Sequence, residues 1–476
     1  MSFDLLPYLT SLQNNIRGRS IAWEGAVRAG TISEEQLNKI RAVDKVRKEQ
    51  QKQIVKNDLG GYSCLFLGAE GKPGILDAAV KRADLVQNIL VLLADLLDGI
   101  PELSKTLSQH SSPYNIFVTL ITRSNDAEDP VSLLSSTVLT ALIMDTSIDH
   151  SKKKHALSEL FKYLSSLTRA SDGSLQDIAV VQYSTLLREK KYRELFWVQR
   201  KETIAPLVTI LQLAAGFSKD ALRSPTWNGT TSIRSNNEGT IGGGVGLQML
   251  YHILLVLWQL SFEGSNVGEG LQDEFDIIPL YVQLLRYSPK EKITRLLVSS
   301  LYNMLVGNRQ KLLPLTVVLR LPALLQNING RHLSDPDLSE DLEALTRMID
   351  DYTKTQTTFD EYAAEIYSGH LYWSPPHRNS TFWLENAHKI LDHEEGAIPK
   401  KLAEIMSKPW VGDKQVLAIA CSDVGSLVKQ VPEKRLYLEK LGLKKRVMEL
   451  MQESDESVRW ESLNALSGWL RYSFES

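Results

Sequence analysis

Apolar residues recur at helical spacing along nearly the whole chain, and this spacing is the strongest constraint on the fold. In 131–146, Leu134, Val138 and Leu142 follow one another at intervals of four residues and share one helix face. The same spacing recurs in three later segments, 156–167, 174–187 and 205–215. Strand-like alternation is nearly absent, and SCLFL (63–67) is the one short ambiguous run. The pattern predicts an all-α protein.

The length of 476 residues favours repeated helical units over a single bundle. Two segments, 278–305 and 443–470, share a helix, a short polar turn and a second helix. The first turn contains Ser288 and Pro289, and the second contains Ser454 and Asp455. Units of this kind bury their apolar faces only by stacking on their neighbours. We therefore expect a HEAT/armadillo-like helical-repeat solenoid.

Three polar stretches interrupt the helical pattern, and one of them, SKPWVGDK (407–414), separates two helices near the C-terminal end. Residues 217–246 are polar and rich in glycine, which predicts a long exposed loop. Residues 351–358, DYTKTQTT, contain no aliphatic side chain and indicate a linker. The predicted organisation is an N-terminal domain over 1–350 and a C-terminal domain over 359–476.

Charge and hydropathy exclude two classes of partner. The formal net charge of −3 argues against nucleic acid, which requires a basic surface. The most apolar window, 247–262, is shorter than the ~20 residues of a bilayer-spanning helix. The N-terminus lacks the pattern of a secretory signal. We expect no direct membrane insertion, so any association with a membrane must come through a partner.

The sequence contains no recognisable catalytic motif. GAEGKPG (68–74) resembles a phosphate-binding loop, but Phe66 stands where the first glycine is required and Pro73 where Ser or Thr is required. His388 and His393 are five residues apart, a spacing that places their rings on different helix faces. We therefore assign no catalytic residue, no cofactor and no metal ligand.

A dense motif at 359–387, FDEYAAEIYSGHLYWSPPHRNSTFWLENA, shows a family resemblance. The segment closely resembles the one that marks the H subunit of the vacuolar-type proton ATPase (V-ATPase). The matching positions are Phe359, Asp360, Glu361, Tyr362, Glu365, Trp373, Ser374, Pro375, His377, Phe382, Trp383 and Asn386. Further stretches at 19–36, 192–197, 246–262, 288–297 and 415–451 are also similar to the family, with Asp423 and Gly425 in matching places.

The resemblance implies a superhelical N-terminal domain of HEAT-like repeats, a short linker and an armadillo-like C-terminal domain. We name one set of residues the aromatic-proline knot, namely Trp373, Pro375, Pro376, Phe382 and Trp383. On this interpretation the knot is mainly structural: its aromatic rings fill the core and its prolines fix a bend between helices.

The resemblance also implies a function. The family member is a non-catalytic regulatory subunit of the cytosolic sector. It is needed for ATP-driven proton transport in the assembled pump and silences ATP hydrolysis in the released sector. The implied partners are the E and G subunits of the peripheral stalk, the cytosolic domain of the a subunit, and catalytic-sector and rotor surfaces after release. The implied location is the cytoplasmic face of the vacuole or another acidic organelle, and the cytosol after release.

Two other interpretations remain open. One is an armadillo-type peptide-binding adaptor in nuclear transport or scaffolding, for which we expect a ladder of Trp and Asn. No such ladder is evident, because Asn303 and Asn464 are isolated. The other is an enzyme on a helical scaffold, which the absence of catalytic motifs disfavours.

SKPWVGDK (407–414) is the candidate contact loop of the C-terminal domain. The residues assigned to partner binding are Lys408, Trp410, Asp413 and Lys414. Tryptophan is enriched at the energetic centres of interfaces. Trp410 has a second interpretation, in which it folds back onto its own domain.

Overall fold

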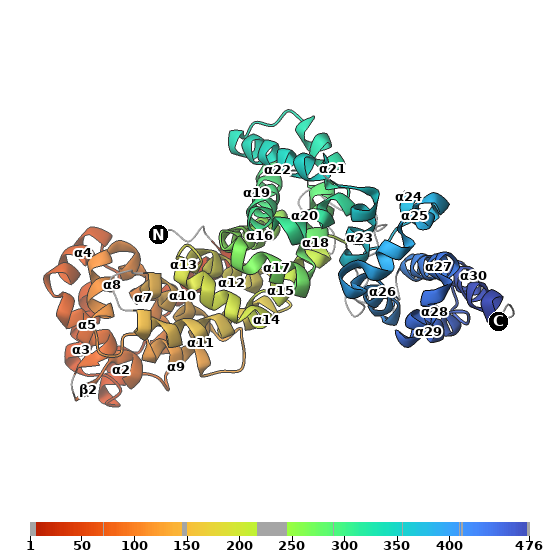
Figure 1. Ribbon diagram of the computed structural model, residues 1–476. Helices are drawn as coiled ribbons and strands as arrows, with labels where there is room; N and C mark the ends of the chain where they lie inside the picture. The colour runs from red at the N-terminus through yellow and green to blue at the C-terminus, as the bar shows by residue number, and fades with distance from the viewer. Residues whose placement is uncertain are drawn as a thin grey trace. The chain divides into compact units, whose positions relative to one another are not determined.

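A computed structural model describes residues 6–69, 71–144, 150–216, 245–288, 290–354, 356–408, 410 and 413–473 (Figure 1). The regular elements of these residues are helices apart from one pair of two-residue strands, which confirms the all-α prediction. The glycine-rich loop predicted at 217–246 lies outside the described residues, except for its last two positions. Pro289 in one predicted turn also lies outside them.

The chain forms two compact units. Unit 1 comprises Met1–Val208 with Gln248–Leu260, and unit 2 comprises Thr209–Leu247 with Ser261–Ser476. The elements of unit 1 are α1 (Pro7–Gly18), α2 (Trp23–Arg28), α3 (Glu34–Val43), α4 (Lys48–Asn57), α5 (Leu59–Leu67), β1 (Gly68–Ala69), β2 (Lys72–Pro73), α6 (Ile75–Ala78), α7 (Ala83–Gly99), α8 (Pro101–Ser108), α9 (Asn115–Thr122), α10 (Pro130–Met144), α11 (His150–Thr168), α12 (Gly173–Leu186), α13 (Lys190–Val198), α14 (Arg200–Thr203) and α16 (Leu247–Ser261). Helix α15 (Ala205–Ala214) begins in unit 1 and ends in unit 2, and the two end residues of α16, Leu247 and Ser261, belong to unit 2.

Unit 2 contains the C-terminal half of the chain. Its elements are α17 (Gly264–Phe275), α18 (Ile277–Tyr287), α19 (Glu291–Gly307), α20 (Arg309–Val318), α21 (Leu321–Asn329), α22 (Pro336–Lys354), α23 (Thr358–Ser368), α24 (Pro375–Arg378), α25 (Ser380–Asp392), η3 (His393–Glu395), α26 (Ala397–Ser407), α27 (Lys414–Gln430), η4 (Pro432–Lys434), α28 (Arg435–Lys440), α29 (Leu443–Leu450) and α30 (Glu456–Ser473).

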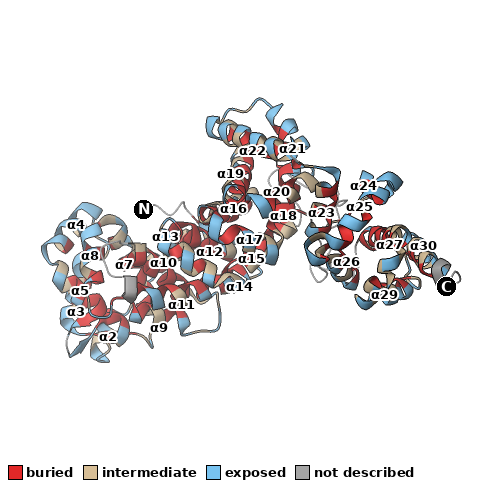
Figure 2. Ribbon diagram, in the orientation of Figure 1, coloured by how far each residue is buried: buried red, intermediate tan, exposed pale blue. Residues whose placement is uncertain are grey.

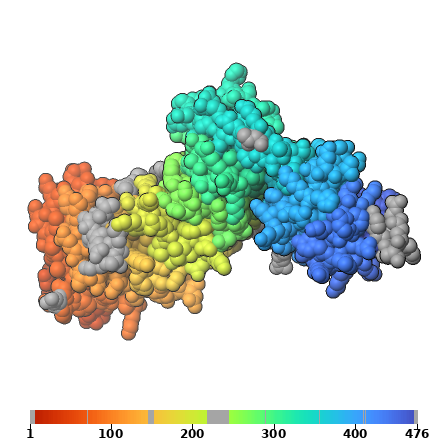
Figure 3. All heavy atoms as spheres, viewed as in Figure 1, coloured from red at the N-terminus to blue at the C-terminus, as the bar shows by residue number. Residues whose placement is uncertain are grey.

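Helices that are close in sequence also pack together in space. Within each unit, neighbouring colours lie side by side in the sphere view (Figure 3). Buried residues line the faces where successive helices meet, and exposed residues cover the opposite faces (Figure 2). Stacking of this kind buries each helix pair against the next and builds a continuous core. The helical-repeat solenoid predicted from the sequence is therefore confirmed.

The local sequence explains where particular helices begin. Ser33 and Gln36 form a reciprocal capping box at the start of α3, and Thr357 and Asp360 form another at the start of α23. The ambiguous run at 63–67 is helical and belongs to α5. A strand would need a partner along its length, and the adjacent β1 and β2 form only a two-residue antiparallel pair.

The repeat pattern predicted in two segments is present. Ser288 lies between α18 and α19, and Ser454 and Asp455 lie between α29 and α30. Gly442 has a φ of 80° and ends the short helix before α29, a conformation that glycine adopts without strain.

The linker predicted at 351–358 overlaps two helices. Helix α22 continues to Lys354 and α23 begins at Thr358. Unit 2 spans both sides of this segment, because α23 and the residues after it contact α20: the Tyr372 hydroxyl donates a hydrogen bond to the backbone carbonyl of Val318. The boundary between domains 1–350 and 359–476 therefore stays a prediction.

Among the described residues, no single helix is long and apolar enough to cross a membrane. Helices α20 and α21 reach that length and apolarity only in combination, and they are bent by 75° relative to each other.

Candidate functional site

The family-like motif folds around a buried polar network. Helix α23 places Tyr362 and Glu365 three residues apart, so both side chains lie on the same face. The short helix α24 supplies His377, and the middle of α27 supplies Asp423. All four residues are buried, although three of them carry ionisable groups of the kind that burial normally disfavours.

His377 joins the two carboxylates. Its Nδ1 lies 2.8 Å from Asp423 Oδ1, and its Nε2 lies 2.9 Å from Glu365 Oε1. The His377 side chain is 0% exposed, so water does not replace either contact. The imidazole thereby links three helices that are separate in the sequence.

The remaining oxygens of the carboxylates are also satisfied. Tyr362 donates its hydroxyl to Asp423 Oδ2 at 3.2 Å. Glu365 accepts from the Tyr372 backbone amide at 2.8 Å and from the Ser374 hydroxyl at 2.7 Å. Buried ionic groups are tolerated when their hydrogen-bonding capacity is filled in this way.

The electrostatics keep the imidazole charged. Burial by itself lowers the pKa of His377, but the nearby carboxylates of Asp423 and then Glu365 outweigh it and raise that pKa to about 10. Burial raises the pKa of Asp423, and the facing imidazolium opposes this shift. His377 is therefore a cation at neutral pH, and the network is a buried ionic link between helices.

The network is not arranged as a metal centre. Over the described part of the chain, no group of three or more His, Cys, Asp or Glu side chains is arranged to hold a metal ion. Both imidazole nitrogens are already engaged by carboxylates. The arrangement can hold α23, α24 and α27 in register, which is a positioning role.

The structure divides the aromatic-proline knot between core and surface. Phe382, Trp383 and Pro376 are buried, whereas Pro375 is exposed. The Phe382 and Trp383 rings both lie against Tyr362, with centroid distances of 5.3 and 5.4 Å. Two rings of the knot therefore pack against the tyrosine of the polar network.

Trp373 occupies the edge of the knot. It is half-buried, and the Arg378 guanidinium lies 4.5 Å from its ring centroid. Such cation–π contacts contribute about 0.5–1 kcal/mol at exposed sites. This ring therefore packs partly on the core and partly beneath a charged side chain.

The structure corrects the expectation that Trp410 projects from the loop to contact a partner. It is only 6% exposed, and its indole Nε1 donates to the Ile405 carbonyl at 2.7 Å. This carbonyl lies in the last turn of α26, where helices leave backbone acceptors without partners. The structure thus shows the second interpretation, in which Trp410 folds back onto its own domain.

Among the polar residues of the contact loop, Lys408 is exposed, and Asp413 and Lys414 are half-buried. Lys408 Nζ lies 3.0 Å from Glu404, and Lys414 Nζ lies 3.0 Å from Glu453. Asp413 is half-buried, and burial raises its pKa. Pro409, Val411 and Gly412 lie outside the described residues. Partner binding by Lys408, Asp413 and Lys414 stays a prediction.

The sequence did not show that Glu365, His377 and Asp423 meet. Glu365 and His377 belong to the motif at 359–387, and Asp423 belongs to a separate family-like stretch, 46 residues after His377. One feature of the sequence does point to a buried polar network: ionisable residues lie among aromatic residues that are expected in a core. Only the packing of α27 against α24 brings the third member into place.

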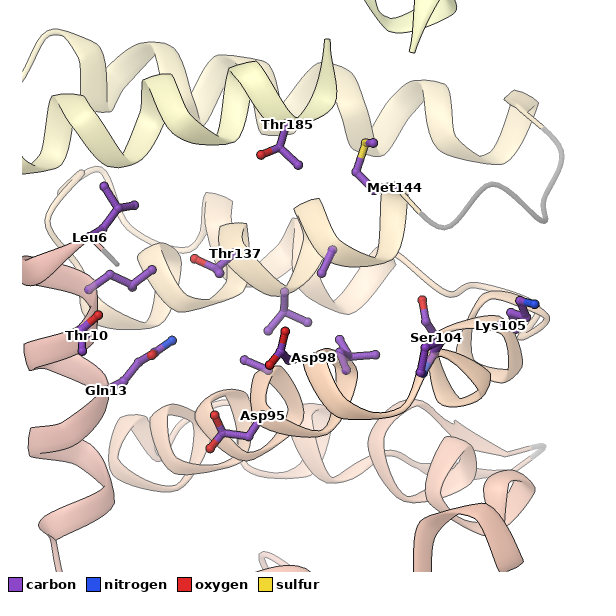
Figure 4. Close-up of a pocket in the computed structure, with 16 residues that line it drawn as sticks. Leu6, Thr10, Gln13, Asp95, Asp98, Ser104, Lys105, Thr137, Met144 and Thr185 are labelled. Carbon is purple, nitrogen blue, oxygen red and sulfur yellow. The ribbon is translucent and has the colours of Figure 1, made fainter. Parts of the chain in front are cut away.

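Unit 1 contains a separate hollow among α1, α7, α8, α10 and α12 (Figure 4). Its volume is about 450 Å³, and Leu6, Val138 and Met144 supply part of its apolar wall. Ser104 and Thr137 also line it, and the Ser104 hydroxyl has no hydrogen-bond partner there.

Comparison with known proteins decides the family. Two family models, both for the H subunit of the V-ATPase, match residues 7–349 and 355–474. The chain belongs to the V-ATPase H-subunit family. The V-type proton ATPase H subunit of Drosophila melanogaster is 24% identical over 493 aligned positions, which cover 100% of this chain and 93% of that protein.

Two further relatives carry the same family name. A probable V-type proton ATPase H subunit of Caenorhabditis elegans is 32% identical over 225 residues, covering 46% of this chain and 49% of that protein. The probable V-type proton ATPase H subunit of Oryza sativa is 24% identical and covers 94% of this chain and 93% of the relative. Among solved structures, a designed armadillo repeat protein is 11% identical with a TM-score of 0.36, covering 66% of this chain and 98% of its own.

Proposed function

We propose that this chain is a non-catalytic regulatory subunit in the cytosolic sector of the V-type proton ATPase. It supports ATP-driven proton transport in the assembled pump and silences ATP hydrolysis when the sector is released. The observation that carries the proposal is the pair of H-subunit matches, which run over 7–349 and 355–474. The fly relative aligns with the full length of the chain and supports the same assignment.

The proposed partners follow the two predicted domains. The domain over 1–350 binds the peripheral stalk, which is built from the E and G subunits. The domain over 359–476 contacts the cytosolic domain of the a subunit in the pump, and catalytic-sector and rotor surfaces after release. A helical solenoid suits this role because its long surface can engage two partners at once. The chain then acts at the cytoplasmic face of an acidic organelle, and in the cytosol after release.

The direct test removes the chain from cells and measures two quantities on isolated organelle membranes, namely pump assembly and ATP-driven proton transport. We expect the other subunits to remain assembled while proton transport is lost. Re-expression of the chain should restore transport. Normal proton transport without the chain contradicts the proposal. Co-purification with nuclear-transport cargo in place of pump subunits favours the peptide-binding adaptor.

The contact loop provides a test of silencing with a matched control. Lys401 and Lys408 both pair with Glu404, at 2.8 and 3.0 Å, but only Lys408 belongs to the loop. If the loop contacts the released sector, Lys408→Glu should weaken silencing and Lys401→Glu should not. Equal silencing by both variants and the parent chain removes Lys408 from the interface.

A further inference from the structure

A cationic cleft lies among α19, α20 and α22 in unit 2. Its volume is about 620 Å³, within the 300–1,000 Å³ typical of ligand sites. Helices α19 and α22 lie side by side (Figure 1), and α20 closes the cleft. The residues that matter for its chemistry are Tyr302, Arg309, Leu313, Arg347, Met348 and Tyr352.

Acidic side chains of the chain itself neutralise the charge of the two cleft arginines only weakly. Arg347 Nη2 lies 4.0 Å from the Glu343 carboxylate, and the two side chains are 75% and 69% exposed. Arg347 Nε also donates a hydrogen bond of 3.4 Å to the Glu343 backbone carbonyl, which leaves most of the guanidinium uncompensated. For Arg309, no carboxylate among the described residues lies within ion-pair distance. Asp351 also lines the cleft, but it pairs with Lys354 at 3.6 Å. Both guanidinium groups are therefore available to an external anion.

The surface between the arginines is apolar. Tyr302, Met348 and Tyr352 are half-buried and supply this accessible surface, whereas Leu313 is only 4% exposed and belongs to the core. A bare inorganic anion uses none of this surface, whereas an acidic side chain next to an apolar one uses both parts. Arginine favours such ligands because its planar fork matches a carboxylate with two hydrogen bonds.

We propose that this cleft binds an acidic peptide segment of a partner protein, with carboxylates on Arg309 and Arg347 and an apolar side chain against Met348, Tyr302 and Tyr352. Nucleic acid fits less well, because only two arginines line the cleft and Asp351 adds a negative charge. The proposal goes beyond the role in the proton pump and can be tested on the isolated full-length chain.

The experiment measures fluorescence anisotropy of a labelled ten-residue peptide of alternating Glu-Glu and Leu-Leu pairs. A second peptide has glutamine in place of every glutamate. The test variant is Arg309→Gln with Arg347→Gln. The matched control is Arg435→Gln, which removes an arginine from α28 in the same unit. A thermal melt of each variant checks that the fold is retained.

We expect the double variant to bind the acidic peptide about tenfold more weakly, because it loses two exposed ion pairs that each contribute modestly to the affinity. Arg435→Gln should bind like the parent chain, and the glutamine peptide should bind weakly to all of them. Binding by the double variant within twofold of the parent overturns the proposal. Full displacement by inorganic phosphate at the peptide's own concentration also overturns it, because the cleft is then a simple anion site.

Discussion

The Nδ1 atom of His377 lies 2.8 Å from Oδ1 of Asp423, and both side chains are 0% exposed. With Glu365 on the other imidazole nitrogen, this contact ties the family motif at 359–387 to α27. The free-energy cost of removing one partner from such a link is larger than the net gain of forming it, because a charge is then left buried and unpaired. This asymmetry gives the first prediction.

His377→Ala should lower the free energy of unfolding by about 3–5 kcal/mol, since Asp423 and Glu365 lose their shared cation. Urea denaturation followed by circular dichroism measures the change. His388→Ala is the matched control, because His388 is 66% exposed and lies 3.8 Å from Glu433. The control should shift stability by no more than about 0.5 kcal/mol. Equal effects of the two variants contradict a buried ionic link.

The same link predicts a dependence on pH. The pKa of His377 is about 10 in the folded protein, above its ordinary value of 6.5. A raised folded-state pKa gives stability that is complete below pH 6.5 and is lost as pH rises through about 10. The difference in unfolding free energy between the parent and His377→Gln should therefore shrink from pH 6.5 to pH 10. A difference that stays constant over this range indicates a neutral imidazole.

Trp410 should behave as a core residue in spite of its place in a polar loop. Trp410→Ala should cost about 3–5 kcal/mol, because it empties a buried site and leaves the Ile405 carbonyl without its donor. Trp460 provides the control, because it is 64% exposed on α30. Trp460→Ala should change the melting temperature little. A larger loss of stability from Trp460→Ala than from Trp410→Ala contradicts the core position.

The close packing of α27 on α30 predicts a difference between two glycines. A Cβ at Gly425 would lie 2.9 Å from the Ala465 Cα, whereas a Cβ at Gly468 would meet its nearest neighbour, a Val428 methyl, at 3.5 Å. Gly425→Ala should destabilise the protein by about 1–3 kcal/mol through overpacking. Gly468→Ala should be neutral or slightly stabilising, because alanine favours helices over glycine. Thermal denaturation compares them, and equal melting temperatures refute the close approach.

Periodicity and motif chemistry determined much of this protein before its tertiary structure was considered. The helical spacing of apolar residues requires helices, because a strand exposes alternate side chains and cannot bury residues four apart on one face. The turns at Ser288 and at Ser454 follow from the same local chemistry. The dense motif at 359–387 indicated the family, and two family matches now show it.

Only the tertiary structure decided which side chains meet. The local sequence predicts that Trp410 is an exposed loop residue. In the structure it is buried, because its indole donates to a backbone carbonyl at the end of α26 and its ring packs in the core. In the sequence, Glu365, His377 and Asp423 are separate polar residues. In the fold they must pair, because burying any one of these charges alone has a high free-energy cost. Periodicity reports which face of a helix is apolar. It does not report which distant helix covers that face, because that choice depends on packing across the whole core.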